Sequence, residues 1–132
     1  CSFVDDIYTV AEMLARQDDI NVLMVKDYIR CPKINGYRSY HMIIEVPVFF
    51  SDRKENMRVE VQIRTIAMDF WASLDHQMKY KKDVEDASEI SEELKECAEV
   101  IAQTDLKMLS LRRKIEDRES KENLLQFDKD PM

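Results

Sequence analysis

The spacing of apolar and polar residues predicts one helix, three strands and two further helices along the chain. Apolar residues recur at helical intervals near the start, at Ile7, Val10, Ala11 and Leu14. Two β-branched, apolar segments follow, and a third segment alternates strictly in polarity. The predicted elements are a helix over residues 5–17, strands over 20–29, 37–50 and 57–65, and helices over 66–80 and 88–118. A loop is expected at 31–36, and a polar turn at 51–56 joins the last two strands in an antiparallel hairpin.

The strand predicted at residues 57–65 separates its side chains by face. The apolar ones are Val59, Val61 and Ile63, and the polar ones are Arg58, Glu60, Gln62 and Arg64. The preceding strand offers Ser39 and His41 on one face, with Arg38 and Tyr40 on the other. A polar row on one sheet face is most often solvated surface, whereas polar residues on two adjacent strands favour a cleft.

The last two helices each carry an apolar stripe. In the helix at 66–80 its members are Ile66, Phe70, Trp71, Leu74 and Met78. In the helix at 88–118 they step by four and three residues, at Ile90, Leu94, Cys97, Ile101, Thr104, Met108, Leu111 and Ile115. This spacing is typical of a heptad-like seam. Packing on the protein's own sheet is the favoured explanation, and a coil between subunits is the alternative.

Helices before, between and after the strands predict an α+β fold with a mixed or antiparallel β-sheet flanked by helices. At 132 residues, one domain is expected. Its body is residues 1–82, residues 83–120 form a long acidic helix on the body or on a partner subunit, and residues 121–132 form a polar, frayed tail. The chain opens at Cys1 rather than at a methionine, so we expect it to be part of a longer protein.

Charge is distributed unevenly along the sequence. The net charge is −7, yet residues 26–41 sum to +3 and residues 83–99 sum to −7. The acidic whole repels nucleic acid and acidic membrane, whereas the basic segment can hold a small anion. The sequence shows no apolar run of membrane-spanning length and no signal peptide. Its three cysteines form no CxxC pair, which fits reduced thiols in the cytoplasm.

The only glycine of the chain, Gly36, lies in this basic segment between Asn35 and Tyr37. Glycine permits positive φ and lets a ligand approach the backbone, although Asn-Gly is above all a hairpin signal. Tyr37 offers a plane on which a base can stack, and Glu60 offers hard oxygens to a divalent cation. Candidate phosphate-binding cations are Lys26, Arg30, Lys33, Arg38, His41 and Arg64. The sequence contains no P-loop, GxGxxG, HExxH or GxSxG motif.

Three segments in fixed order carry a family resemblance. They are KINGYRSYH from residue 33, VEVQIRT from residue 59 and AMDFWASLDHQMKYK from residue 67. Together they resemble the synthetase domain of the RelA/SpoT family, and most of all the small, stand-alone alarmone synthetases (GTP pyrophosphokinases). The resemblance covers about residues 1–82, with the acidic helix fitting the family's C-terminal helical region.

The resemblance implies a fold and a reaction. The fold is a mixed sheet flanked by helices, akin to nucleotidyltransferases. The reaction moves the β,γ-pyrophosphoryl group of ATP to the 3′-hydroxyl of GTP or GDP, with Mg²⁺, and yields AMP and pppGpp or ppGpp. Members of this kind are cytoplasmic and commonly homo-oligomeric, often tetrameric. The choice between GTP and GDP stays open.

The resemblance also implies roles for single residues. Glu60 matches the glutamate credited with binding Mg²⁺ or deprotonating the 3′-hydroxyl, and Tyr37 matches the tyrosine that stacks on guanine. The other acceptor-site positions are Lys26, Lys33, Asn35, Gly36, His41, Gln62 and Arg64. Ile34 stands where the family usually has proline, and Asp69 where close relatives often have asparagine.

The family's magnesium-binding aspartate and ATP-gripping basic residues belong to a stretch that this sequence lacks, so the chain alone is expected to be inactive.

Two further functions remain as alternatives. A non-catalytic module that binds guanine nucleotides or RNA is one alternative, although the acidic net charge disfavours RNA. An oligomerising scaffold, based on the heptad-like stripe, is the other. Glu60 favours the enzyme, because a carboxylate beside phosphates repels them unless a cation intervenes.

Overall fold

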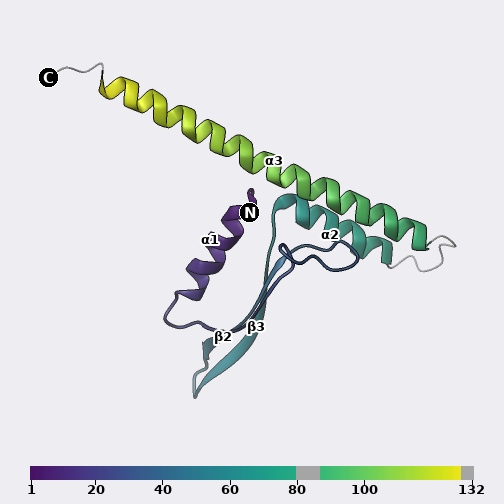
Figure 1. Ribbon diagram of the computed structural model, residues 1–132. Coiled ribbons are helices and arrows are strands. Elements are labelled where there is room, and N and C mark those ends of the chain that lie inside the picture. Colours follow the sequence, from purple (N-terminus) through teal and green to yellow (C-terminus); the bar gives the residue numbers. More distant parts are fainter. Residues whose placement is uncertain (80–86, 129–132) are drawn as a thin grey trace.

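Three strands and three helices make up the part of the chain that this computed structural model describes, residues 1–79 and 87–128 (Figure 1). In chain order they are α1 (Val4–Ala15), β1 (Asn21–Asp27), β2 (Tyr40–Phe49), β3 (Lys54–Ile63), α2 (Ile66–Lys79) and α3 (Ala87–Phe127). The type and order of the elements are as the sequence predicts. Tyr80 and the boundary expected at residues 82–83 lie outside the described residues.

The strands form one antiparallel sheet in the order β1-β2-β3. This confirms the α+β class and, of the two arrangements expected, the antiparallel one. Phe49 pairs with Lys54, and the backbone N–H of Phe50 donates to the carbonyl of Arg53 at 2.7 Å. The hairpin turn is therefore tighter than predicted and β3 begins earlier, because polar residues at an exposed tip can extend the ladder without burying anything.

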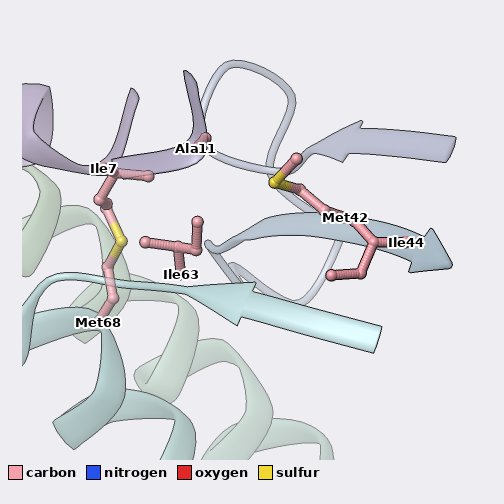
Figure 2. Close-up of a cluster of buried hydrophobic side chains, with 6 residues drawn as sticks. All are labelled: Ile7, Ala11, Met42, Ile44, Ile63 and Met68. Atoms are coloured by element: carbon pink, nitrogen blue, oxygen red, sulfur yellow. The ribbon is translucent and has the colours of Figure 1, made fainter. Parts of the chain in front are cut away.

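Helix α1 covers one face of the sheet and forms the hydrophobic core with it. The buried cluster comprises Ile7 and Ala11 of α1, Met42 and Ile44 of β2, Ile63 of β3 and Met68 of α2 (Figure 2). Val59 pairs with Ile44 and so shares this face, yet it is exposed. Alternation along the strands sends their polar residues to the opposite face.

Helix α2 buries a different side from the one predicted. Trp71 is buried as expected, but Ile66, Phe70 and Met78 are exposed, and the other fully buried residue is Met68. The apolar residues of α2 extend around more than half of the helix circumference, so their spacing does not determine which part faces the core. The indole N–H of Trp71 donates to the carbonyl of Leu94 at 2.7 Å, which ties α2 to α3.

The buried seam of α3 is displaced by about one residue from the predicted stripe. Cys97, Met108, Leu111 and Ile115 are exposed, and the buried positions are Ala98, Asp105 and Leu109. A pattern of large apolar side chains does not identify Ala98 and Asp105, because one is small and the other is acidic. The 4-3 pattern predicts an amphipathic helix correctly but places its contact face wrongly.

Helix α3 is also longer than predicted, since it continues to Phe127 and past α1 toward the C-terminus (Figure 1). The tail expected at residues 121–132 is thus helical over 121–127, and 129–132 lie outside the described residues. Leucine, glutamate and lysine fill this segment, and no glycine or proline interrupts it before Pro131. These residues have high helix propensity, so the helix continues despite little burial.

A buried hydrogen bond joins the end of the sheet to α3. The hydroxyl of Thr65 donates to Asp105 at 2.7 Å and accepts the backbone N–H of Met68 at 3.1 Å, which caps the start of α2. Asp105 is 5% exposed, and burial raises the pKa of its carboxyl above the ordinary 3.8 because desolvation disfavours the charged form. The bond from Thr65 lowers that pKa and is the smaller influence.

We expect Asp105→Asn to stabilise the protein more at neutral than at acidic pH. A carboxyl whose folded-state pKa is raised adds stability below its unfolded pKa and loses it as pH rises through the folded one. Asparagine can still accept from Thr65 and never ionises. Thermal unfolding followed by circular dichroism should give a Tm difference from wild type that grows between about pH 4 and about pH 7. The exposed Asp117→Asn on the same helix is the control, and a pH-independent difference for Asp105→Asn would contradict the expectation.

Candidate functional site

The sheet face opposite α1 carries the polar residues that the sequence predicts there. Lys26 of β1 pairs with His41 of β2, and His41 pairs with Gln62 of β3. The next row on the same face consists of Met24, Ile43 and Glu60. Because cross-strand neighbours on one face lie in contact distance, the register brings His41, Gln62 and Glu60 together.

The hydroxyl of Tyr37 is the centre of a hydrogen-bond network on this face. It accepts a bond from Nη2 of Arg64 at 2.6 Å and lies 3.0 Å from Nε2 of His41 and 3.2 Å from Oε1 of Gln62. Nδ1 of His41 lies 3.3 Å from Oε1 of Glu60. The amide of Gln62 donates to the same carboxylate oxygen at 3.2 Å. Four predicted site residues, from a loop and two strands, thus meet around Tyr37.

Donor and acceptor rules give this network a direction. Arg64 can only donate, and it donates to both the hydroxyl of Tyr37 and Oε1 of Gln62. The single hydroxyl proton is then best used on Nε2 of His41, which places the ring proton on Nδ1, facing Glu60. The result is a chain of donors that begins at a guanidinium and ends at a carboxylate.

The electrostatics of His41 favour a neutral ring. Burial lowers the pKa of His41 below its ordinary 6.5, and the nearby charges of Lys33 and Arg64 lower it further. Glu60 raises the same pKa, less strongly than burial lowers it. The imidazole is therefore neutral at pH 7, and with its proton on Nδ1 it donates one hydrogen bond to Glu60.

Lys33 brings a further cation to the aromatic side of the network. Its Nζ lies 4.9 Å from the ring centre of Tyr28 and 5.3 Å from that of Tyr37. Tyr28 in turn meets the ring of His41 edge-on at 5.0 Å. The site therefore combines flat aromatic surfaces with mobile positive charge, which suits a ligand that has both a ring and phosphates.

Of the cavities that the predicted site residues line, one contains Tyr37 and another contains His41. The larger, of about 530 Å³, is lined by Lys33, Asn35, Tyr37 and Arg64 and by Ala72, Ser73, Asp75, His76 and Gln77 of α2. The smaller, of about 280 Å³, is lined by Met24, Lys26, Tyr28, Lys33, His41, Ile43 and Glu60. Lys33 lines both, so the acceptor-site residues expected from the resemblance surround two adjoining hollows. Gln62 reaches them through its bonds to Tyr37 and Glu60.

Sequence reasoning missed the contribution of α2 and included two arginines that lie elsewhere. Ser73, His76 and their neighbours belong to a quoted motif, but nothing in their spacing distinguishes them from any solvated helix face. Arg30 stacks near Tyr8 at 5.7 Å and pairs with Asp27 at 3.7 Å. Arg38 is directed at α3. The basic segment therefore does not converge on one point.

Gly36 adopts the positive φ expected of it, at 96°. The close approach to its backbone is made by α3, however, because a Cβ placed on Gly36 would lie 2.8 Å from Cβ of Ala98. Contact between a ligand and this glycine stays a prediction. Asn35 closes the turn by accepting the N–H of Tyr37 on its side chain at 3.0 Å.

Comparison with known proteins covers most of the chain. A family model described as a region found in RelA / SpoT proteins matches residues 1–85. The chain is 48% identical over 116 residues to GTP pyrophosphokinase YwaC and 36% identical over 117 residues to GTP pyrophosphokinase YjbM, both of Bacillus subtilis (strain 168). These matches take in 88% and 89% of this chain and 55% and 56% of the relatives. The chain thus spans about half the length of the curated relatives it matches.

Solved structures agree with the sequence matches. The small alarmone synthetase 2 from Bacillus subtilis superposes with a TM-score of 0.83 at 49% identity, over 86% of this chain and 63% of that one. The small alarmone synthetase 1 from the same organism, bound to its product pppGpp, gives 0.81 at 35% identity, over 88% and 59%. Family model, sequence and fold agree over the segment that holds Tyr37, His41 and Glu60, and the chain belongs to the RelA/SpoT family.

Proposed function

We propose that a protein containing this chain transfers the β,γ-pyrophosphoryl group of ATP to the 3′-hydroxyl of GTP or GDP, giving AMP and pppGpp or ppGpp. Relatives named GTP pyrophosphokinases support this, as does the one bound to pppGpp. The observation that carries the proposal is the carboxylate of Glu60, held by His41 and Gln62 in a hollow that Lys26 and Lys33 also line. A carboxylate there suits proton removal, whereas it repels phosphate in a site that only binds.

The residues of this chain have separate tasks in the proposed reaction. The guanine base stacks on Tyr37, and the acceptor phosphates lie among Lys26, Lys33 and Arg64. Glu60 accepts the proton of the 3′-hydroxyl. At the same time the oxygen of that hydroxyl forms a bond to the β-phosphorus of ATP. The bond between the β-phosphorus and the α,β-bridging oxygen breaks, and AMP leaves with that oxygen. Such transfers depend on positioning and charge neutralisation more than on covalent chemistry.

Three polar side chains complete the acceptor site. His41 and Gln62 hold the carboxylate of Glu60 in place, since each lies within hydrogen-bond distance of its Oε1. Asn35 lines the larger cavity beside Tyr37. Gly36 serves the same site indirectly, because its backbone conformation shapes the turn that carries Tyr37.

A divalent cation, proposed as Mg²⁺, fits next to Glu60. Among the described residues, no group of three His, Cys, Asp or Glu side chains is placed to hold a metal ion. Mg²⁺ is commonly held by one or two carboxylates together with substrate phosphates and water. The side chain of Glu60 is 58% exposed and can supply one such ligand. The cation would neutralise charge on the transferred group.

Full-length protein incubated with ATP, GDP and Mg²⁺ is expected to form AMP and ppGpp in equal amounts, resolved by nucleotide chromatography. This chain alone is expected to form neither, because it spans about half the length of its curated relatives. A reaction without GDP is the control. If folded full-length protein bound GDP but formed no product, the non-catalytic guanine-nucleotide module would replace the enzyme. RNA binding would then be tested next, against the expectation from a net charge of −7.

We further propose a homo-oligomer, with a tetramer favoured, in the cytoplasm. Helix α3 exposes large apolar side chains over its second half, among them Leu111, Ile115, Leu124 and Phe127. Exposed apolar residues gathered on one element support a subunit contact there. Of the helices that the structure describes, none combines the length and apolar character needed to cross a membrane.

A further inference from the structure

Arg38 carries its charge away from both cavities and toward α3. Its side chain is 11% exposed. Nη1 donates to the backbone carbonyls of Ala98 at 3.0 Å and Gly36 at 3.3 Å, and Nη2 donates to the carboxylate of Glu99 at 3.0 Å. One guanidinium thus bridges the backbone of a loop and the backbone of a helix. A helix carbonyl has a second lone pair available for such a donor.

The loop concerned touches α3 at a second, adjacent point. We call residues 28–39 the acceptor loop. Gly36 of this loop is buried, and its contact with Ala98 is so close that no side chain larger than hydrogen fits. The loop is closed on itself by two backbone bonds, from Gly36 N–H to Lys33 at 2.9 Å and from Lys33 N–H to Tyr37 at 3.1 Å. Tyr37 therefore stands between two residues that are both fixed to α3.

Trp71 packs at the same junction. A residual cavity of only about 10 Å³ remains among Gly36, Arg38, Met68, Trp71, Ala98 and Ile101, so loop and helices fit tightly there. The ring of Trp71 lies 6.4 Å from that of Tyr37.

We infer that Arg38 is a positioning residue: it fastens the acceptor loop to α3 and so holds Tyr37 at the wall of the larger cavity. The inference rests on the proposed function, because it takes Tyr37 to contact the acceptor nucleotide. Helix α3 is then part of the acceptor site without touching the ligand. Arg38 acts by orienting a neighbour, so its loss should impair acceptor binding more than the chemical step and leave ATP binding alone.

Arg38→Met in the full-length protein tests this, since methionine keeps an aliphatic stem and removes every donor. The KM for GDP is expected to rise about tenfold, as for loss of a charge-assisted hydrogen bond. The KM for ATP should stay within about twofold of wild type, and kcat should fall by less than the KM for GDP rises, because the hydroxyl of Tyr37 keeps its bonds to Arg64 and His41. Arg38→Lys keeps the charge but concentrates its donors on one nitrogen, and it should give an intermediate KM for GDP. Glu99→Gln, which removes only an exposed ion-pair partner, should change it by less than about twofold.

Each outcome bears on the inference. A wild-type KM for GDP in Arg38→Met overturns it, as does an equal loss of kcat in that variant. If Arg38→Met fails to fold by circular dichroism, Arg38→Lys decides, and a wild-type KM in that variant overturns it. If wild type forms no ppGpp, the proposed function fails by itself. The Kd for GDP from calorimetry then takes the place of KM: a tenfold difference between Arg38→Met and wild type supports the fastening role, and equal values overturn it.

Discussion

Replacing Glu60 by glutamine is expected to abolish turnover of the full-length protein while leaving GDP binding without metal nearly unchanged. Glutamine keeps an oxygen for His41 Nδ1–H and for the amide of Gln62, so the network retains its shape. It removes both the base for the 3′-hydroxyl proton and the charge that a hard cation needs. General-base catalysis contributes on the order of 10²-fold or more, so a loss of at least that size should appear in kcat by nucleotide chromatography.

The matched control for that experiment is Glu55→Gln, on the same strand. Glu55 pairs with Arg53 near the hairpin tip, away from both cavities. Its variant should turn over at the wild-type rate, and calorimetry with GDP should give the same Kd for both variants. Near-normal turnover in Glu60→Gln would make the proposed role of Glu60 wrong, and the polar face of β3 would then be solvated surface.

The ring of Tyr37 is expected to stack on the guanine base, and its hydroxyl to orient His41. Tyr37→Ala removes the stacking surface and should weaken GDP binding by about 1–3 kcal/mol, as base–aromatic stacking does in single-strand binders. Tyr37→Phe keeps the ring but disconnects Arg64 from His41. It should therefore bind GDP nearly as wild type does. Its kcat should fall about tenfold, because the His41 imidazole that contacts Glu60 loses the hydroxyl that orients it.

Tyr8→Phe is the control for the loss of a hydroxyl. That hydroxyl donates to Asp27 at 2.8 Å on the α1 side of the sheet, and burial, with Asp27 beside it, raises the pKa of Tyr8 to about 12. Its removal should affect stability but leave kcat unchanged. An unchanged Kd for GDP in Tyr37→Ala, measured by calorimetry, would show that the ring does not stack on the base.

What the sequence predicts well is local. The alternation along β3 separates Glu60 and Gln62 from Ile63 because one face of the sheet is covered by α1 and the other is not. A short hairpin then sets the antiparallel register of β2 and β3. This register places His41 beside Glu60. Both inferences depend only on period-two geometry and a turn, so they need no knowledge of distant contacts.

What the sequence does not predict depends on partners far along the chain. From the sequence, Asp105 is expected to be a surface acid, but in the structure it is hydrogen-bonded to Thr65. Arg38 is likewise expected to bind phosphate, but it donates to the carbonyl of Ala98. The apolar stripe of α3 misleads for the same reason, since the true seam contains a small residue and a hydrogen-bonded acid. The cavity wall on α2 was missed because a solvated helix face and a ligand-facing one have the same composition.

The ties between α3 and the rest of the chain also constrain when the site can form during synthesis. Arg112 pairs with Asp6 across 106 residues at 3.1 Å, and Arg38 meets Ala98 across 60 residues. When only the strands have left the ribosome, the α3 groups that hold the acceptor loop, such as the carbonyl of Ala98, have not yet been synthesised. Contacts so distant in sequence close late and slowly. Residues 24–77 supply the lining of both cavities, but the acceptor loop reaches its final position only after α3 has been synthesised.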